Sequence, residues 1–569
     1  MRLVGSLVTV TLLAFVLLTT CALGLVQAGS TPVRSRTGMV ISASEIASQI
    51  GARTLKDGGN AVDAVVATGF ALAVTHPTAG NIGGGGFLLH RSANGQAAAY
   101  DFRETAPAAA SPTMFLKAGR YDPDLHHRGY LSVGVPGTVA GLHLAWKEHG
   151  KLPWKRLVEP AVALARDGFI VSDGLARSLA SVLPQMEQYQ ASVAQFSRNG
   201  VPYGAGDLLK QPVLAATLQR IANQGPAGFY EGQTAEIFER EMQRGGGLIT
   251  REDLKQYRAV RRVPIQGSYR GHDIIAMPPP TSGGVTTIEI LNILEGYDIA
   301  QMGAGSSATV HLMAESMRRA FADRAAHLGD PDLNRDMPVE RLLSKPYAAD
   351  LRKGISRNRA SRSSPATFEW PGESDETTHV SIVDADRNAV SMTYTLEQGY
   401  GSKIVLAGAG FLLNNEIGDF NAGPGLTTAD GLIGTAANLA SPAKRMLSSM
   451  APTILTKNGR LFMVTGSPGG RTIINTVLLT ILNVVDFGMN AQEAVDAGRF
   501  HHQWLPDRIT YERFSLSPDT LAALRAKGHE VTQGGNQGVA EVIVYNEAES
   551  MLEGGVDRRQ PDGGAASPR

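Results

Sequence analysis

Two adjacent threonines, Thr377 and Thr378, stand where a polar, Ser- and Arg-rich stretch gives way to alternating polar and apolar residues. A threonine hydroxyl becomes a useful nucleophile only when a base takes its proton, and an N-terminal α-amine is one such base. An α-amine has a pKa of about 8, so part of it is unprotonated at neutral pH. Cleavage of the bond between Glu376 and Thr377 would therefore place nucleophile and base on one residue. Taken alone, two β-branched residues are also what many β-strands begin with.

Several blocks of residues accompany these threonines in a fixed order along the chain. They are residues 83–86 (GGGG), 101–104 (DFRE), 377–381 (TTHVS), 393–396 (TYTL), 413–416 (LNNE), 419–420 (DF), 447–450 (LSSM), 466–470 (GSPGG) and 500–504 (FHHQW). In these blocks the chain resembles the γ-glutamyltranspeptidase (glutathione hydrolase) family of N-terminal-nucleophile hydrolases, over essentially all of its length after residue 28. The resemblance implies an enzyme that cuts itself before Thr377 and then uses that threonine to attack amide bonds.

The resemblance also implies a role for each catalytic residue. Thr377 is expected to be the nucleophile of self-cleavage and of turnover, and Thr395, on the neighbouring strand, to hydrogen-bond and position it. Gly469 and Gly470 are expected to present backbone N–H groups to the developing oxyanion. This makes physical sense, because glycines allow close backbone approach and the following helix directs its positive end to the same place. A phosphate-binding loop is excluded, since residues 466–472 lack the G-x-x-x-x-G-K-[ST] spacing.

The family's γ-glutamyl substrate has a zwitterionic head, so its pocket needs both signs of charge. Arg103 is expected to bind the α-carboxylate as a planar fork, supported by the hydroxyls of Ser448 and Ser449. Glu416 and Asp419 are expected to bind the α-ammonium group.

Some positions depart from the family's pattern. Glu397 stands where the best-known members carry an asparagine that contacts the α-amino group; glutamate can still accept that hydrogen bond and adds negative charge. Gly418 replaces the first aspartate of the usual pair, and Asp430 falls where some members have a tyrosine covering the site. Residues 557–559 read DRR in place of DPR. We expect these changes to leave the chemistry intact and to affect the acceptor, the lid over the site and the balance between hydrolysis and transfer.

The resemblance implies no metal and no organic cofactor. The adjacent His501 and His502 could suggest a metal site, but neighbouring residues on one element point in different directions. No carboxylate lies at ligand spacing from them in the sequence. We therefore expect both histidines to be structural.

Composition restricts the partners and the compartment. The 569 residues include 53 Lys and Arg against 53 Asp and Glu, and a zero net charge argues against a nucleic-acid partner. Residues 3–26 carry no charge and precede Ala28, the pattern of a secretory signal peptide over residues 1–28; an uncleaved membrane anchor is the alternative. The only cysteine, Cys21, would be lost with the signal, which excludes disulfides from the mature chain. We expect a periplasmic or secreted protein, tethered at most by its N-terminus.

The helices and strands that position these residues are predicted from the spacing of apolar residues and from breaks at Gly and Pro. Apolar patterns predict helices over residues 60–75, 285–294, 308–328, 471–485 and from 518 to 528, and a buried strand at 87–89. Residues 379–383 and 389–396 predict a β-hairpin with Thr377 at its head. The polar stretch over residues 352–365 predicts a mobile linker, which continues to the cleavage site at residue 376.

Alternating helices and strands indicate a mixed fold, and the resemblance implies the α+β class with a four-layer αββα sandwich. It also implies a large chain of residues 29–376 and a small chain of residues 377–569 that stay associated as a heterodimer. The substrate would be a glutathione-like γ-glutamyl amide, with water, an amino acid or a peptide as acceptor. The alternatives are an acylase of the same fold for cephalosporin or glutaryl side chains, a poly-γ-glutamate hydrolase, and an uncleaved, inactive secreted binding protein.

Overall fold

A computed structural model describes residues 30–364, 377–426, 428 and 434–568 of the chain. The predicted signal peptide, Glu376 and Asp430 lie outside the described residues. From Pro32 to Arg569 the chain forms one unit, so the predicted cleavage point before Thr377 does not coincide with a domain boundary. Within the described ranges, no helix is both long and apolar enough to cross a membrane.

Two seven-stranded sheets are formed by the described residues, and all neighbouring strands in both are antiparallel. The first sheet has the order β11 (Val260–Arg262), β4 (Ala97–Phe102), β3 (Gly85–Arg91), β15 (Ala389–Thr395), β14 (Thr378–Val383), β2 (Met39–Ser42) and β23 (Gly564–Ala566). The second has the order β1 (Val33–Ser35), β22 (Met551–Val556), β21 (Glu541–Asn546), β17 (Arg460–Gly466), β16 (Thr453–Lys457), β13 (His272–Ala276) and β12 (Ile265–Tyr269).

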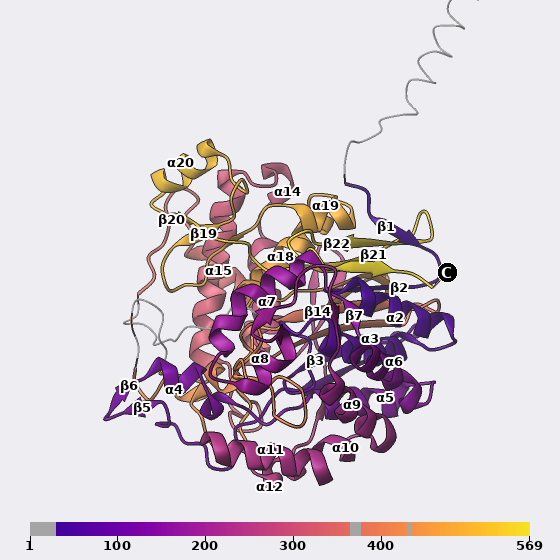
Figure 1. The fold of residues 1–569 in the computed structure, drawn as a ribbon. Helices are drawn as coiled ribbons and strands as arrows, with labels where there is room; N and C mark the ends of the chain where they lie inside the picture. Colours follow the sequence, from indigo (N-terminus) through magenta and orange to yellow (C-terminus); the bar gives the residue numbers. More distant parts are fainter. Residues whose placement is uncertain (1–29, 365–376, 427, 429–433, 569) are drawn as a thin grey trace, which may run out of the picture. The chain divides into compact units, whose positions relative to one another are not determined.

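Helices cover the outer face of each sheet (Figure 1). On the first sheet lie α2 (Glu45–Lys56), α3 (Ala61–Thr75) and α5 (Thr138–His149), with α6 (Trp154–Asp167) and α9 (Pro212–Gln224) packed beyond α3. On the second lie α13 (Gly283–Leu294), α18 (Thr472–Val485) and α19 (Ala491–Asp496), with α15 (Ser307–His327) packed on α13. This arrangement is the αββα sandwich, which confirms the predicted fold class.

Strand β3 shows how the layers are held together. Phe87 and Leu89 belong to the apolar cluster shared with the second sheet, whereas Leu88, between them, belongs to the cluster under the helices. Successive strand side chains point to opposite faces, so a strand in the middle of a sandwich must be apolar on both. The buried strand predicted at residues 87–89 therefore lies within β3.

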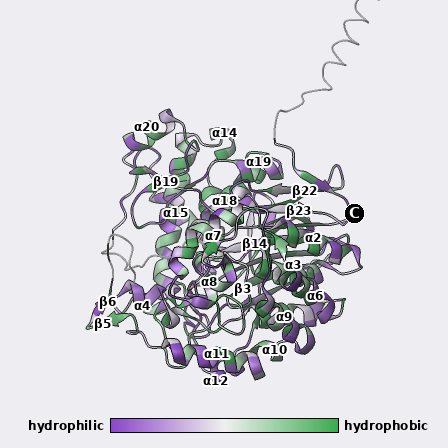
Figure 2. Ribbon diagram, in the orientation of Figure 1, coloured by the Kyte–Doolittle hydropathy of each residue, from purple (hydrophilic) through white to green (hydrophobic). Residues whose placement is uncertain are grey.

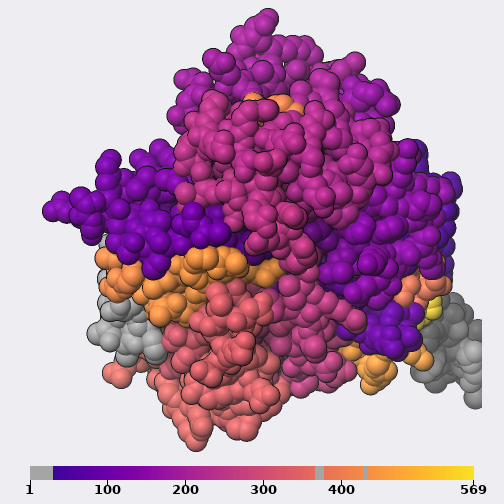
Figure 3. Space-filling view, turned by 90° about the horizontal axis from the view of Figure 1, so that it is seen from below, coloured from indigo at the N-terminus to yellow at the C-terminus, as the bar shows by residue number. Residues whose placement is uncertain are grey.

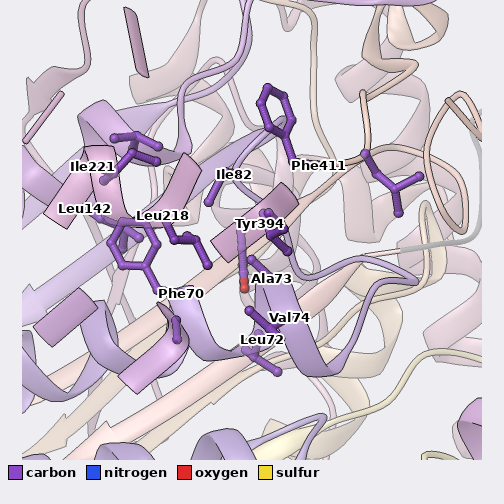
Figure 4. Close-up of a cluster of buried hydrophobic side chains, with 14 of the residues drawn as sticks. Phe70, Leu72, Ala73, Val74, Ile82, Leu142, Leu218, Ile221, Tyr394 and Phe411 are labelled. Atoms are coloured by element: carbon purple, nitrogen blue, oxygen red, sulfur yellow. The ribbon is translucent and has the colours of Figure 1, made fainter. Parts of the chain in front are cut away.

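Helix α3 is buried over its whole length, as its Ala- and Val-rich sequence predicts. It begins with a capping box, in which the Asn60 side chain accepts from the N–H of Asp63 and the Asp63 side chain accepts from that of Asn60. Phe70 of this helix packs among Leu142, Leu218 and neighbouring apolar side chains (Figure 4). In Figure 2, α3 is mostly hydrophobic, whereas hydrophilic residues predominate on the outer helix α12 (Arg251–Gln256).

The remaining described elements are shorter or lie outside the four layers. The helices are α4 (Pro123–His127), α7 (Asp173–Met186), α8 (Gln190–Phe196), α10 (Ala227–Tyr230), α11 (Gly232–Gly245), α14 (Ile299–Met302), α16 (Val339–Leu342), α17 (Lys345–Lys353), α20 (Pro518–Ala526), and the short η1 (Tyr130–Ser132), η3 (Glu416–Asp419) and η4 (Ala436–Asn438). The strands are β5 (Leu116–Lys117), β6 (Arg120–Tyr121), β7 (Phe169–Ile170), β8 (Ser197–Arg198), β9 (Val201–Pro202), β10 (Leu208–Leu209), β18 (Phe500–His501), β19 (Ile509–Tyr511) and β20 (Val531–Gln533).

Segments from before and after Thr377 are interleaved throughout the sandwich. Strand β15 pairs with β3, β14 pairs with β2, and β16 pairs with β13. In Figure 3, orange atoms from after Thr377 lie between purple and salmon atoms from before it. Cutting the chain before Thr377 would therefore leave both pieces joined by sheet hydrogen bonds on several strands.

The predicted hairpin is present as β14 and β15, with Thr378 opposite Tyr394 and Val383 opposite Ala389. The turn between them is held by Asp384, whose carboxylate accepts from the backbone N–H of Asn388 at 2.9 Å. The same carboxylate accepts from the N–H of Ala61 at 3.1 Å, which ties the hairpin to the start of α3.

The predicted linker begins later than its composition indicates. Arg352 belongs to α17, and residues 354–364 contain neither helix nor strand but are held against α15. Ser361 donates its backbone N–H to Glu315 at 2.9 Å, and Ser363 donates its own to Asp507 at 2.8 Å. Polar composition did not distinguish a solvated segment from one that is hydrogen-bonded to the carboxylates of Glu315 and Asp507. Residues 365–376 lie outside the described residues.

We expect Leu218→Ala to lower the free energy of unfolding by about 2–5 kcal/mol, because removing a fully buried leucine side chain leaves a cavity. Val213→Ala, on the same helix α9, is the matched control, since Val213 is 44% exposed. It should change stability by about 0.5 kcal/mol or less. Urea unfolding followed by tryptophan fluorescence measures both, and equal midpoints would contradict this description of the core.

Candidate active site

Thr377 lies directly before β14 and is buried to all but 6% of its surface. Its Oγ1 lies 3.4 Å from Oγ1 of Thr395, the last residue of β15. The Thr395 hydroxyl also accepts from the backbone N–H of Glu397 at 2.9 Å, and the backbone carbonyl of Thr395 accepts from the Asn81 side chain at 2.9 Å. The hairpin thus brings the predicted nucleophile next to its predicted positioning residue.

The glycine loop connects β17 to α18 beside Thr377. Gly469 has φ 124° and Gly470 φ 53°, a region that favours glycine. A Cβ on Gly469 would lie 2.6 Å from Oγ1 of Thr472 and 2.9 Å from Cα of Gly538. Among the backbone hydrogen bonds of turns and loops in the described residues, none is donated by the N–H of Gly469 or of Gly470. The loop can therefore offer two amides to a ligand.

Two cavities meet at Thr377. The smaller, of about 20 Å³, is lined by seven of the expected site residues: Thr395, Glu397, Glu416, Asp419, Ser448, Ser449 and Gly470. The larger, of about 310 Å³, is lined by Gly469, His76, Ser178, Asn536 and Asp562 among others. Thr377 therefore lies between a small, charged pocket and a larger one.

Arg103 follows β4 and is fully buried. It donates to the carboxylates of Glu416 and Asp419, and Oε2 of Glu104 lies 3.6 Å from its Nη1. The guanidinium lies behind these carboxylates and is not among the groups that line the smaller cavity. The sequence assigned Arg103 to the α-carboxylate and the two acids to the α-ammonium group of a substrate head, whereas the structure joins all three side chains in one ion-pair network.

Carboxyl groups outnumber cations in this network, and burial raises the pKa of three of them. Burial raises the pKa of Glu416 well above its ordinary value, the pKa of Glu104 to about 8 and that of Glu397 to about 7. The charge of Arg103 opposes the rise at Glu416 and Glu104. A buried carboxyl group without sufficient cationic charge nearby takes up a proton. The pocket is therefore suited to an additional cation, which would displace such protons.

The two expected serines are fixed by different partners. The Ser448 hydroxyl oxygen accepts from the backbone N–H of Met450 at 3.1 Å. The Ser449 hydroxyl oxygen accepts from Nη2 of Arg324 at 2.9 Å, and Nε of the same arginine donates to Ser282 at 2.6 Å. Because a guanidinium can only donate, Arg324 forces the hydrogen of the Ser449 hydroxyl to point elsewhere.

Sequence reasoning missed several residues of this site. Glu104 adjoins Arg103 in a matching block, and a buried Arg-Glu pair in an apolar strand end could have indicated it. Arg324 and His127, whose Nδ1 lies 3.2 Å from Oε1 of Glu397, come from segments without any matching block. No spacing pattern in the sequence indicates these two.

His501 and His502 are buried and bonded to different partners. Nε2 of His501 lies 2.6 Å from Oε1 of Gln503, and Nε2 of His502 lies 3.2 Å from Oδ1 of Asp507. Both rings therefore have protein partners, in keeping with the structural role expected of them.

A separate group in the described chain, His311, Glu315 and His529, has potential ligand atoms within 4.8 Å of one another. Nδ1 of His311 lies 2.7 Å from Nε2 of His529, and Glu315 accepts from Arg319 at 2.8 Å and from Ser361. These atoms are thus engaged in a hydrogen-bond network that anchors residues 354–364.

Comparisons with known proteins agree with this geometry. The family model described as gamma-glutamyltranspeptidase matches residues 47–567. The glutathione hydrolase proenzyme of Escherichia coli (strain K12) is 49% identical over 539 residues, which cover 93% of this chain and 92% of that protein. The cephalosporin acylase structure from Bacillus halodurans has a TM-score of 0.83 at 27% identity and covers 96% of this chain and 98% of that one. The Helicobacter pylori gamma-glutamyltranspeptidase structure has a TM-score of 0.55 at 45% identity and covers 56% and 91%.

Two facing sheets between helix layers, with a threonine at the head of an inner strand beside a glycine loop, define an N-terminal-nucleophile hydrolase. Within that class, the chain belongs to the γ-glutamyltranspeptidase family. The resemblance recognised in the sequence is thereby confirmed.

We expect Gly469→Ala to lower kcat for an anilide substrate by about 100- to 1,000-fold, because the new Cβ displaces one oxyanion donor. Gly535→Ala is the matched control, since a Cβ there meets nothing within 4 Å. Steady-state kinetics of both processed variants provides the test. Unchanged turnover of Gly469→Ala would remove the loop from the chemistry.

Proposed function

We propose that this chain is a self-processing γ-glutamyltransferase and glutathione hydrolase that works through a γ-glutamyl ester of Thr377. The observation that carries the proposal is the position of the Thr377 hydroxyl, 3.4 Å from Thr395 and between a small charged pocket and a larger cavity. The family shared with glutathione hydrolase proenzymes supports the same reaction.

Self-cleavage would begin with attack of the Thr377 hydroxyl on the carbonyl carbon of Glu376. The C–N bond between the two residues breaks, a C–O ester bond forms, and the hydroxyl proton passes to the departing nitrogen. Water then hydrolyses the ester, leaving a carboxylate on residue 376 and an amine on residue 377. The products are the chains 29–376 and 377–569, which we propose to remain a heterodimer because β14 and β15 stay paired with β2 and β3.

In turnover, the α-amine of Thr377 would accept the hydroxyl proton while Oγ1 attacks the γ-glutamyl carbonyl. The amides of Gly469 and Gly470 would stabilise the oxyanion, and the leaving amine would depart with the proton. The cavity of about 310 Å³ on the Gly469 side gives room for that amine and for the next acceptor. Water, an amino acid or a peptide amine then takes the glutamyl group from the ester.

Binding of the zwitterionic head would exchange partners within the buried network. The substrate's α-ammonium group would take its place among the carboxylates of Glu397, Glu416 and Asp419, which releases Arg103 in part. Arg103 and the two serine hydroxyls would then receive the α-carboxylate. Because burial raises the pKa of the Glu397 carboxyl to about 7 and that of Glu416 above its ordinary value, an incoming ammonium group should lower both pKa values on binding.

We also propose that the chain is exported through its N-terminal segment, on the basis of the uncharged run over residues 3–26. Sequencing the N-terminus of the large chain from the periplasm or medium tests this. A first residue of Gly29 supports cleavage after Ala28, and an intact N-terminus supports an anchor.

We expect Thr377→Ala to run as one band on a denaturing gel and to hydrolyse no γ-glutamyl-anilide, because it has no hydroxyl for either step. Thr377→Ser keeps the hydroxyl and should still give two bands, with a new N-terminus at residue 377. A cleaved and active Thr377→Ala protein would contradict the scheme, and an uncleaved wild-type protein would favour the inactive binding protein.

We expect the enzyme to prefer γ-glutamyl-anilide over glutaryl-anilide by at least about 100-fold in kcat/KM. The glutaryl group lacks the ammonium group, so its carboxylate would draw Arg103 away from Glu416 and Asp419 without bringing a cation in exchange. Parallel measurement of both anilides, with and without glycylglycine, gives the ratio and the share of transfer. A preference for the glutaryl compound would favour the acylase that the Bacillus halodurans structure represents.

A further inference from the structure

His127, the last residue of α4, lies beside the substrate pocket without lining it. Its Nδ1 is 3.2 Å from Oε1 of Glu397, and its backbone carbonyl accepts from the Asn415 side chain at 3.1 Å. The imidazole is 21% exposed, whereas the glutamate side chain is 1% exposed. The pair therefore connects a partly solvated ring to a buried carboxylate that lines the pocket.

Gly418, in η3, lies against the same pair. A Cβ built on Gly418 would lie 2.4 Å from Nδ1 of His127 and 3.0 Å from Oε1 of Glu397. Its backbone is outside the left-handed region, so the turn itself does not require glycine. The imidazole occupies the space that a side chain at position 418 would need.

We propose that His127 is a positioning residue of this pocket, which holds the Glu397 carboxylate for the substrate's α-ammonium group and depends on Gly418 for its space. The inference rests on the γ-glutamyl function proposed above. It explains two departures from the family's pattern together, because Glu397 and Gly418 both lie beside His127. The glutamate adds a negative charge, the imidazole supplies a balancing donor, and the glycine makes room for the ring.

The charges of the pair support each other. Burial alone lowers the pKa of His127, but the hydrogen bond and charge of Glu397 more than offset this and place it above its ordinary value. Burial raises the pKa of Glu397 to about 7, and His127 acts against that rise. Without the imidazole, Glu397 would therefore remain protonated to a higher pH and would lose its attraction for an ammonium group.

Other charged groups face the pair from several elements. They are Asp419 and Glu416 on η3, Arg128 beside His127 in the chain, and Glu187 and Lys403 across a cavity of about 500 Å³ that His127 lines. The neighbouring His126 ring is titratable as well, but burial lowers its pKa well below the ordinary value. Asp419 raises the pKa of both members of the pair, and Lys403 lowers that of Glu397. These groups stay in place in the variants below, so a change in pH dependence reports on His127.

The test compares L-glutamate with glutarate, which lacks the α-ammonium group, as competitive inhibitors of γ-glutamyl-anilide hydrolysis from about pH 5 to about pH 9. The ratio of the two Ki values isolates ammonium recognition. As the pH is lowered, protonation of Glu397 should reduce the tighter binding of L-glutamate relative to glutarate. In His127→Ala we expect the midpoint of this loss to lie about one pH unit or more higher than in the wild type. His127→Asn, which keeps a donor near Nδ1, should shift less, and both variants should raise KM more than they lower kcat. A pH profile in His127→Ala equal to that of the wild type would overturn the proposal.

A second measurement needs no activity. Gly418→Ala should lower the melting temperature in the wild-type background and much less in the His127→Ala background, because the clash is with the imidazole. Equal effects in both backgrounds would show that His127 does not occupy this space. If wild-type enzyme binds L-glutamate no better than glutarate, the proposed substrate class is wrong, and the melting temperatures still decide the role of His127.

Discussion

The hydrogen-bond register between β14 and β15 fixes where the nucleophile lies, and the rest of the site depends on it. Thr378 pairs with Tyr394, so Thr377 falls beside Thr395 at the open end of the hairpin. A slip of one residue would turn the hydroxyl to the other face of the sheet. β14 is also paired with β2 from Val380 onward, so the strand that begins directly after Thr377 has ladders on both sides. A nucleophile attached to such a strand needs little reorganisation before attack.

Self-cleavage and lasting association are compatible here because the chain crosses between sheets before and after the cut. Both sheets contain strands from the large and the small chain, and their inner faces share one apolar cluster. Separating the fragments would break the ladders between β3 and β15 and between β2 and β14 and would expose that cluster. Exposing this apolar surface would cost far more free energy than the chain gains in conformational freedom when one peptide bond is cut.

The charged pocket follows a different logic, because its carboxyl groups outnumber the cations that pair with them. Arg103 is fully buried, and its ion pairs with Glu416 and Asp419 do not neutralise all the surrounding carboxyl groups. Isolated charges in such a place are costly, so protons or a ligand cation must supply the balance. A substrate head that carries both an ammonium and a carboxylate group can satisfy acids and arginine together, which a plain dicarboxylic group cannot. His127 contributes to this balance from outside the pocket.

The sequence by itself determined the family, the hairpin with Thr377 at its head, the glycine loop and the helices that follow it, because these depend on local pattern and on blocks such as residues 466–470. It also indicated most of the residues that line the charged pocket, from Glu397 to Ser449. Only the tertiary structure decided that Arg103 is covered by its carboxylates, that Arg324 orients Ser449 and that His127 fills the space beside Gly418. These contacts join residues far apart in the chain. Their energies depend on burial and on the distances between charged groups, which are set by the tertiary fold and not by local sequence spacing.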